Sequence, residues 1–386
     1  MQNKNRRNRI QKFAVTVSVL ATLRAGGRDE GPGLPPLPQP GGGTGPVGEL
    51  SYIYYDRLYG SECFRIPAIV KTRQGSLLAF AEKRWKRASG DSGDIDIVVR
   101  RSTDNGATWA VGVDVWNDGG NTCGNPVPIV CMETGRVHLL MTWNDGRDTW
   151  GPLVNGTGHN TRRPFYTYSG DDGLTWATPR EITTQVKDPS WNWYGTGPCH
   201  GIQVTKGEYK GRLVAPNYHT TGSTAQSHAA YSDDNGMTWH KGNPTEAGIG
   251  ECAVAELPDG SLILHGRQSS GNNRYYAISV DGGENWGPLA EETGFVDARC
   301  QAGMVNSPRG LFLSNAASTE RKNMTIHWSL DNGRTWPKKY VVFEGLSAYS
   351  DLVMVGEDKI AIFFEGGVQR YTDGISFQII DLDDFN

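Results

Sequence analysis

The chain has 386 residues, and its 38 lysines and arginines against 42 aspartates and glutamates leave a formal net charge of −4. No long basic run follows residue 50, so the composition argues against a nucleic-acid partner. Hydrophobic residues at 37% suffice for a packed core, and twelve tryptophans, fifteen tyrosines and fifty glycines favour many short strands joined by turns over a helical bundle. We therefore expect an all-β protein.

The beginning of the chain differs from the rest. Residues 1–27 start with a basic segment and continue into the eleven-residue apolar run Phe13–Leu23, which is short for a membrane span. This order predicts a signal-like leader and a secreted or membrane-associated protein, with a mitochondrial-type presequence as the alternative. Residues 28–48 are rich in proline and glycine and are expected to form a disordered linker. The folded domain is expected to span residues 49–386.

Within that domain, one eight-residue pattern, S-x-D-x-G-x-[TN]-W, occurs five times. The intervals between the five serines are 67, 63, 47 and 50 residues, a spacing typical of propellers or solenoids. The copies are Ser102–Trp109, Ser169–Trp176, Ser232–Trp239, Ser279–Trp286 and Ser329–Trp336. The length of the domain then predicts a six-bladed β-propeller with four strands in each blade. The segment Tyr371–Phe377 is a candidate remnant of a sixth copy.

Each copy reads as a tight turn between two strands. The aspartate side chain can bond to nearby backbone amides, and the glycine can adopt a positive φ. The closing tryptophan is expected to bury its ring between neighbouring units. Because each copy is complete as a turn, we interpret the five aspartates as structural and not as calcium ligands or catalytic groups.

The cysteines give no sign of a metal site. They are scattered, and the chain contains neither a C-x-x-C nor an H-E-x-x-H pattern, so no zinc site and no cofactor is expected. The six residues are Cys63, Cys123, Cys131, Cys199, Cys252 and Cys300. We expect mostly free, buried thiols, although the even count also permits disulfides.

The five copies resemble the Asp-boxes of the sialidase (neuraminidase) superfamily, and the resemblance covers residues 50–386. Further motifs of that family occur in the same order. They are Phe64-Arg65-Ile66-Pro67, Ala81-Glu82-Lys83-Arg84, Gly250-Glu251-Cys252, Leu264-His265-Gly266-Arg267, Ser318-Thr319-Glu320-Arg321, Ala348-Tyr349-Ser350-Asp351 and Phe363-Phe364-Glu365. The chain most resembles bacterial-type exo-α-sialidases of the glycoside hydrolase family 33 type.

The resemblance implies an exo-α-sialidase that hydrolyses terminal sialic acid from glycoproteins, glycolipids such as gangliosides, and oligosaccharides. A monomer is expected. Two alternatives share the same motifs: a trans-sialidase or intramolecular trans-sialidase, and a non-catalytic sialoglycan-binding propeller. Occupation of every implied catalytic position argues against the non-catalytic alternative.

Sialic acid carries a carboxylate on its anomeric carbon, and the implied residues match that chemistry. Arg65, Arg267 and Arg321 would bind the carboxylate through charge-assisted hydrogen bonds. Three clustered cations repel one another, so at least one needs an acidic partner, and Glu365 is the candidate to pair with Arg65.

The same carboxylate would repel an anionic nucleophile, whereas a neutral tyrosine hydroxyl avoids the repulsion. By resemblance, Tyr349 is the nucleophile of a retaining mechanism and Glu251 is the general base that takes its proton.

The implied acid/base lies in a segment with three aspartates. Asp96 begins a strand pattern, whereas Asp91 lies in a Gly/Ser loop at the spacing of the family's catalytic aspartate, and we favour Asp91 over Asp94. Protonating the leaving oxygen requires a raised pKa, which a loop closing over the substrate would supply.

Other binding residues are implied more loosely by the resemblance. Arg84 and Asn125 are expected to contact the substrate, Asn125 within the loop that lines the N-acyl pocket. Trp143 or Trp150 would supply an apolar wall there. For His200 a structural role and a functional role both remain open.

Overall fold

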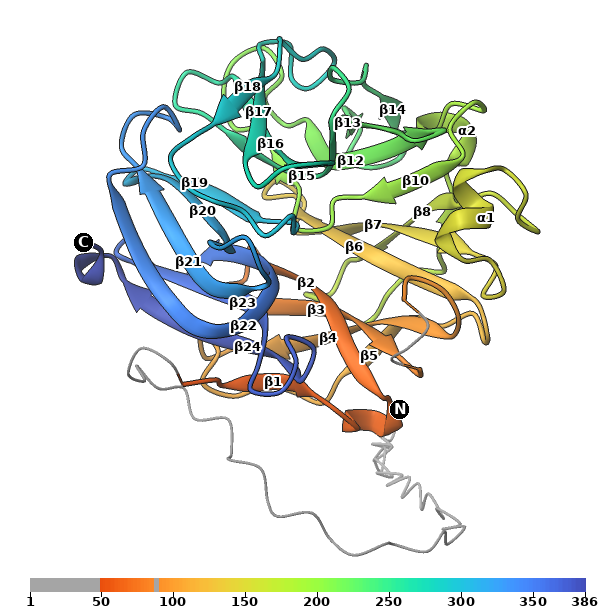
Figure 1. Ribbon diagram of the computed structural model, residues 1–386, viewed down its shortest axis with the longest axis horizontal. Helices are drawn as coiled ribbons and strands as arrows, with labels where there is room; N and C mark the ends of the chain where they lie inside the picture. The colour runs from red at the N-terminus through yellow and green to blue at the C-terminus, as the bar shows by residue number, and fades with distance from the viewer. Residues whose placement is uncertain (1–48, 87–89) are drawn as a thin grey trace, which may run out of the picture. The chain divides into compact units, whose positions relative to one another are not determined.

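The computed structural model describes residues 49–86 and 90–386 (Figure 1). The expected leader, residues 1–27, and linker, residues 28–48, lie outside the described residues. The described part contains 24 strands, two short α-helices, α1 (Trp150–Val154) and α2 (Thr183–Val186), and two 3-10 turns, Leu58–Gly60 and Leu382–Asp384. The fold is therefore all-β, as predicted. Neither helix has the length and apolar character needed to cross a lipid bilayer, and the described residues contain no other α-helix.

The first large sheet has eight strands. Its order is β2-β3-β4-β6-β7-β8-β9, with β5 paired to β4. The strands are β2 (Cys63–Lys71), β3 (Leu77–Arg84), β4 (Ile95–Ser102), β5 (Val113–Trp116), β6 (Thr122–Val130), β7 (Val137–Asn144), β8 (Arg163–Ser169) and β9 (Arg180–Glu181). All pairs are antiparallel except one, the single parallel contact of Ile95 in β4 with Thr122 in β6. Two antiparallel sets of four strands therefore meet at that contact.

Two smaller sheets follow along the chain. The five-stranded sheet contains β10 (Trp193–Thr196), β11 (Ile202–Gln203), β12 (Leu213–Thr221), β13 (Thr224–Ser232) and β14 (His240–Lys241). The four-stranded sheet contains β15 (Ile249–Glu256), β16 (Leu262–Gln268), β17 (Arg274–Ser279) and β18 (Ala290–Glu292). Both are antiparallel, with short connections between successive strands.

The last sheet has seven strands and joins the two ends of the described chain. Its order is β1-β24-β23-β22-β21-β20-β19. The strands are β1 (Tyr52–Tyr55), β19 (Gly303–Ser307), β20 (Gly310–Ala316), β21 (Lys322–Ser329), β22 (Lys338–Met354), β23 (Lys359–Gly367) and β24 (Gly374–Asp381). The long strand β22 pairs with β21 through its first half and with β23 through its second half. β1 pairs with β24, so the N-terminal strand completes the C-terminal part of this sheet.

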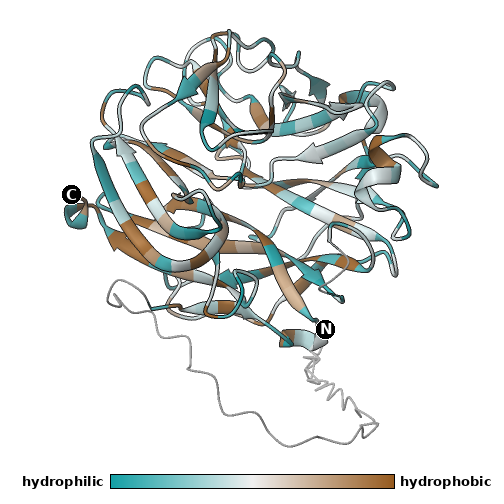
Figure 2. Ribbon diagram, viewed as in Figure 1, coloured by the Kyte–Doolittle hydropathy of each residue, from teal (hydrophilic) through white to brown (hydrophobic). Residues whose placement is uncertain are grey.

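The hydrophobic cores lie between successive sets of strands. One core combines Ile69 and Phe64 of β2 with Phe363 of β23 and Phe377 of β24. Strands covered by neighbours on both faces, such as β3 and β7, are buried along their whole length. Figure 2 shows apolar bands crossing adjacent strands, whereas many connecting loops are hydrophilic.

The five repeated turns each follow the third strand of a set. In the copy after β13, the hydroxyl of Ser232 donates to Asp234 at 2.8 Å and accepts from the amide of Gly236 at 2.9 Å. The amide and hydroxyl of Thr238 donate to the Asp234 carboxylate at 2.9 and 2.6 Å. The other four copies contain the same set of bonds, with Asn285 replacing the threonine in the fourth copy. The turns are thus closed structural units, as the sequence predicted.

The tryptophan of each turn packs toward the preceding set of strands. Trp109 meets Phe377 edge to face at 5.2 Å between ring centroids, and Trp176 meets Phe80 in the same way at 5.5 Å. This close approach also requires the glycine of the turn. Gly106 has a φ of +87°, and a Cβ at this position would lie 2.2 Å from the Phe377 ring. Trp239 is buried and the other four tryptophans are half-buried, so the predicted burial between neighbouring units is confirmed in full for Trp239 alone.

The prediction that Tyr371–Phe377 is the remnant of a sixth turn is wrong. This segment covers the end of the β23–β24 connection and the start of β24, whereas the other turns follow the third strand of a set and lead into the fourth. In the last set the fourth strand is β1, which comes from the other end of the domain. No hairpin is needed at that point, which explains why the pattern occurs five times. All six cysteines are buried, as expected.

Candidate functional site

Four of the predicted site residues lie on the first strands of the sets: Arg65 on β2, Asn125 on β6, Glu251 on β15 and Tyr349 on β22. β2 packs against β6 and β22, β15 packs against β12 and β19, and β19 packs against β22. The register is irregular in four of these strands, between Arg65 and Ala68 in β2, Gly124 and Val127 in β6, Ile249 and Cys252 in β15, and Ser347 and Ser350 in β22. Such irregularities redirect side chains next to functional sites. Here they coincide with Arg65, Asn125, Glu251 and Tyr349.

Two of the irregular strands share one local design. Ile66 and Asn125 both precede a proline and both have positive φ, 61° and 54°. This conformation is strained for a β-branched residue such as isoleucine. Glu365 accepts the amide of Ile66 at 2.9 Å, and Glu82 accepts the amide of Asn125 at 2.8 Å. In both places a buried glutamate therefore holds the strained turn.

Each of those glutamates also binds an arginine. Glu365 accepts Nε and Nη2 of Arg65, both at 3.0 Å, so the predicted pair is present with two parallel hydrogen bonds. Glu82 accepts Nε of Arg84 at 2.9 Å. One carboxylate thus orients an arginine and the neighbouring strand at the same time.

The tyrosine and the glutamate of the predicted nucleophile–base pair are in direct contact. The Tyr349 hydroxyl lies 2.6 and 2.8 Å from the two carboxylate oxygens of Glu251. Nη1 of Arg267 donates to the same hydroxyl at 2.9 Å and to Glu251 at 2.6 Å. Burial raises the pKa of the Tyr349 hydroxyl well above its ordinary value, and the Glu251 carboxylate raises it further, against the lowering effect of the arginines. Tyr349 is therefore protonated at neutral pH and has a carboxylate within reach of its proton.

The three predicted arginines surround that tyrosine. The guanidinium carbon of Arg65 lies 5.0 Å from the centre of the Tyr349 ring, and that of Arg321 lies 5.6 Å away. Two carboxylates, Glu365 and Glu251, face the three cations. Within residues 49–86 and 90–386, Arg321 has no carboxylate within 4.0 Å. The cluster therefore keeps one positive charge in excess, and such a cluster attracts a carboxylate.

Asp91 joins the site through Arg84. Nη2 of Arg84 donates to Asp91 at 2.9 Å, and Nη1 donates to the carbonyl of Gly90 in the same loop. The prediction of a raised pKa is wrong for this arrangement. Desolvation raises the pKa of Asp91, but the charges of Arg84, Arg65 and Arg162 outweigh it, so the pKa lies below its ordinary value.

The two neighbouring aspartates lie in a different environment. Asp96 belongs to β4, as predicted, and accepts Nε1 of Trp85 at 2.8 Å. Burial and the charge of Asp96 raise the pKa of Asp94, and the cations that lower it are Lys83 and Lys86, not the site arginines. Contact with the arginine cluster therefore distinguishes Asp91 from Asp94.

Two residues predicted to contact the substrate also have partners within the protein. Arg84 is 2% exposed, and its Nε, Nη1 and Nη2 all donate to protein oxygens. Asn125 donates through Nδ2 to the carbonyl of Thr196 at 3.1 Å, and its Oδ1 lies 3.4 Å from Nη2 of Arg162. Both residues are therefore bonded to neighbouring groups of the protein, and their contact with the substrate stays a prediction.

The two tryptophans predicted for the apolar wall lie in different environments. Trp143 is 8% exposed, donates Nε1 to Asp118 at 2.6 Å, and has the guanidinium of Arg163 over its ring at 4.1 Å. Trp150 is 58% exposed at the start of α1. Neither tryptophan contacts the residues assembled around Tyr349 through any of the interactions found in the described part of the chain.

Three residues of the site were not assigned from the sequence. Glu82 lies in the Ala81–Arg84 motif, in which only Arg84 was assigned a role. Asn125-Pro126 repeats the residue-before-proline arrangement of Ile66-Pro67, so it indicates that a second glutamate must bind the strained amide. The Tyr371 ring lies 4.7 Å from the Arg321 guanidinium and 5.6 Å from that of Arg65. Arg162, directly before β8, had no sequence signal of its own.

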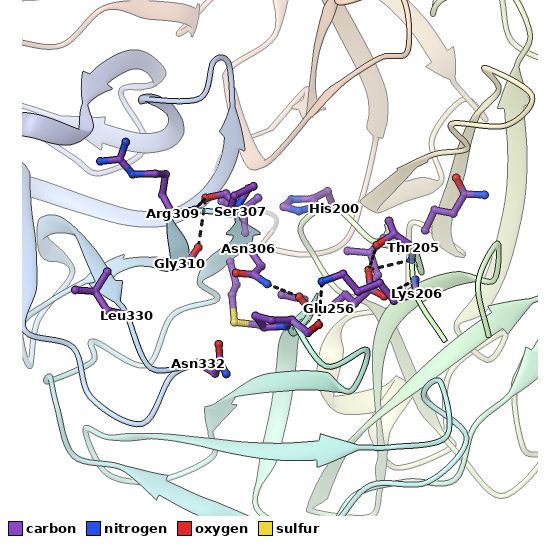
Figure 3. Close-up of a pocket in the computed structure, with 17 residues that line it drawn as sticks. His200, Thr205, Lys206, Glu256, Asn306, Ser307, Arg309, Gly310, Leu330 and Asn332 are labelled. Atoms are coloured by element: carbon purple, nitrogen blue, oxygen red, sulfur yellow. Dashed lines mark hydrogen bonds between the residues drawn. The ribbon is translucent and has the colours of Figure 1, made fainter. Parts of the chain in front are cut away.

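His200 has a structural role and borders a second hollow. Its Nδ1 and its amide contact the buried carboxylate of Asp351 at 2.8 and 3.0 Å, and Asp351 also accepts the amide of Ile69. Figure 3 shows the hollow beside His200, where Glu256 accepts the amide and hydroxyl of Thr205. The polar groups of this hollow are largely bonded to one another. In the described part of the chain, no group of His, Cys, Asp or Glu is arranged to hold a metal ion.

Comparison with known proteins agrees with this geometry. A family model described as a BNR repeat-like domain matches residues 75–362. A sialidase of Bacteroides fragilis is 32% identical over 351 residues, which are 84% of this chain and 63% of that protein. An exo-alpha-sialidase of Aspergillus fumigatus is 30% identical, over 79% of each chain. The solved structure of the Hadza microbial sialidase Hz136 has a TM-score of 0.77 at 31% identity, over 84% of this chain and 67% of that one.

The chain therefore belongs to the sialidase family of BNR-repeat proteins, as the motifs predicted. Within that family it is similar to bacterial-type exo-α-sialidases. It spans 63% of the length of the Bacteroides relative.

Proposed function

We propose that this protein is an exo-α-sialidase that releases terminal sialic acid from glycoproteins, glycolipids and oligosaccharides. The observation that carries the proposal is the contact of the Tyr349 hydroxyl with Glu251 at 2.6 Å inside a cluster of three arginines. The cluster matches a substrate whose reacting carbon carries a carboxylate. The neutral tyrosine avoids the repulsion that an anionic nucleophile would meet.

In the proposed reaction, Arg65, Arg267 and Arg321 bind the substrate carboxylate and hold the anomeric carbon near Tyr349. Glu251 takes the phenolic proton while the Tyr349 oxygen attacks the anomeric carbon, and the glycosidic bond breaks. Water then displaces the tyrosine, which recovers its proton from Glu251, and the configuration is retained. The raised pKa of Tyr349 supports a general base, because the hydroxyl does not ionise unaided at neutral pH.

Asp91 is proposed to protonate the leaving oxygen and later to activate the water. Its low pKa depends on nearby positive charge, including that of Arg65. A substrate carboxylate bound to Arg65 offsets part of that charge and raises the pKa of Asp91 toward the value that an acid needs.

The proposal includes six four-stranded blades. Its support is the circuit of contacts through β2, β6, β12, β15, β19 and β22, with β11 bridging β6 to β15. The two larger sheets then each contain two blades, joined by the β4–β6 contact and by the long strand β22. A secreted or membrane-associated location and a monomeric state remain proposals from the sequence.

The test is product analysis after incubation with sialyllactose. We expect free sialic acid and lactose in equal amounts. A transferred sialoside in the presence of excess galactoside would identify a trans-sialidase, and an anhydro sugar an intramolecular trans-sialidase. Absence of any product, with retained binding of a sialic acid analogue, would identify a binding protein.

A further inference from the structure

Arg162 is a buried cation without a buried anion beside it. Arg162 is 1% exposed. Among residues 49–86 and 90–386, no carboxylate oxygen lies within 4.0 Å of its guanidinium nitrogens. The comparably buried arginines Arg84, Arg212 and Arg274 each have a carboxylate partner, at 2.5 to 3.0 Å. An uncompensated buried charge is costly, so a protein retains one where it has a use.

The guanidinium of Arg162 is also short of hydrogen-bond acceptors. Nη2 contacts the Thr142 hydroxyl at 2.8 Å and Oδ1 of Asn125 at 3.4 Å. Nε and Nη1 are buried and have no partner among the described residues. One face of the group is covered by the Trp193 ring, 4.1 Å from the guanidinium carbon. The group is therefore held firmly by its neighbours while two of its nitrogen atoms remain unsatisfied.

The position of Arg162 connects it to the candidate site. It touches Asn125, whose amide is bound by Glu82, and Glu82 binds Arg84, which holds Asp91. Its charge reaches Asp91 directly, as one of the three that lower the pKa of that carboxyl. Arg162 thus lies on the Asn125 and Asp91 side of the site, while Arg65, Arg267 and Arg321 gather around Tyr349.

We propose that Arg162 is a substrate-contacting residue whose free guanidinium nitrogens bind an oxygen acceptor on the sugar, away from the carboxylate. The acceptor is either the carbonyl of the N-acyl group or a hydroxyl of the sugar. This inference rests on the proposed function.

The test compares Arg162→Met with Arg163→Met. Arg163 is a matched control, because its guanidinium also covers a tryptophan ring at 4.1 Å, but it is paired with Glu181 at 2.9 Å. With a methylumbelliferyl sialoside, we expect Arg162→Met to lower kcat/KM about 10- to 100-fold, the loss of one or two hydrogen bonds to a charged group. Binding of 2,3-didehydro sialic acid should weaken by a similar factor. Arg163→Met should stay within about twofold.

Stability separates this role from a structural one. Methionine replaces an uncompensated buried charge with an apolar side chain of similar length, so Tm should stay the same or rise in Arg162→Met. The alkaline limb of the kcat/KM profile should also move to higher pH, because Asp91 acts in its protonated form and a cation that lowers its pKa is removed. Arg162→Lys should recover part of the affinity, since it keeps the charge without the planar fork.

Parallel assays with an N-acetylated sialoside and its deaminated 5-hydroxy analogue identify the acceptor. A larger loss on one member of the pair assigns the acceptor to that substituent, and equal losses assign it to a hydroxyl that both sugars share. Wild-type kinetics in Arg162→Met, or a loss of activity explained by a lower Tm, would overturn the inference. Failure of the wild-type protein to bind or cleave any sialoside would instead overturn the proposed function.

Discussion

The repeated turns and the candidate site are both built from polar residues at strand ends, but they satisfy those residues in opposite ways. In a turn such as Ser232–Trp239, the hydrogen bonds of serine, aspartate and threonine close within eight residues. In the site, Glu365 reaches Arg65 across 300 positions of the chain, and Glu251 reaches Tyr349 across 98. The turn leaves nothing for a ligand, whereas the site retains positive charge and unbonded donors.

This difference shows that polar side chains bonded within one turn serve folding, whereas polar side chains that keep free charge or donors serve function. A self-contained turn can be repeated five times, because each copy needs only its own residues and an apolar surface on the preceding unit. A site assembled from separate strands occurs once. Its excess charge is tolerated because the surrounding sheets hold the side chains in place.

The largest effect is expected for Tyr349→Phe. Phenylalanine keeps the packing against Arg65 and Arg321 but removes the attacking oxygen, so kcat should fall at least about 10³-fold, or about 4 kcal/mol of activation free energy. Steady-state kinetics should show the loss while binding of a sialic acid analogue survives.

Tyr371→Phe is the matched control, because the Tyr371 ring lies against the same two arginines. It should keep kcat within about threefold, since only the hydroxyl of a ring outside the Glu251 contact is lost. Near-normal hydrolysis by Tyr349→Phe would exclude this residue as the nucleophile.

The next effect distinguishes Asp91 from Asp94 by the leaving group. Asp91→Asn should lower kcat/KM on sialyllactose about 10²- to 10³-fold, because the leaving alcohol needs a proton. On a methylumbelliferyl sialoside, whose phenolate leaves more readily, the loss should be much smaller.

Asp94→Asn should affect both substrates equally. If Asp94→Asn instead showed the dependence on the leaving group and Asp91→Asn did not, the roles of the two aspartates would be exchanged. The paired rates on the two substrates are the only measurement needed.

Glu365→Gln tests how far a site residue also serves the fold. It removes the negative charge that Arg65 binds through two hydrogen bonds, and it weakens the bond to the strained Ile66 amide. We expect a loss of about 3 kcal/mol in the free energy of unfolding. Urea titration measures it. Glu320→Gln, an exposed partner of Lys322, should change stability by less than about 0.5 kcal/mol. Equal stabilities of the two variants would contradict the paired role of Glu365.

A smaller effect is expected in the turns. Asp234→Ala removes the acceptor of the Ser232 and Thr238 bonds and should cost about 1 kcal/mol of stability. Activity should remain within about twofold of wild type at a temperature below unfolding. A specific loss of kcat in this variant would show that the turns are not purely structural.

The smallest effect is expected for the contribution of one turn, through Asp234, to the loss of folding stability at low pH. Burial raises the pKa of Asp234, but hydrogen bonds from Thr238 and Ser232 outweigh it, so the pKa lies below its ordinary value. The unfolded state then binds more protons in acid, and stability falls as pH drops from about 5 toward the folded pKa. Tm of Asp234→Asn should therefore decline less than that of wild type between pH 6 and pH 3. Parallel declines would contradict the shift.

The sequence determined the class of fold, the positions of the five turns and most of the motif residues. These features depend on short-range chemistry. Serine, aspartate and glycine at fixed spacing close a turn wherever they occur, and a tryptophan at its end needs only a neighbouring apolar surface. The motifs likewise identified Arg65, Glu251, Arg267, Arg321, Tyr349 and Glu365 before their contacts were known.

Only the tertiary structure decided which charges meet. Glu82 contacts Asn125 across 43 positions of the chain, Arg162 contacts Asn125 across 37, and Arg84 donates to Asp91. The direction of the Asp91 pKa is the sum of opposing effects, desolvation and the charges of three arginines brought together by folding. The missing sixth turn depends on the pairing of β1 with β24 across the two ends of the domain. Long-range pairing and summed electrostatics have no signature in local spacing, which is why sequence patterns alone left them open.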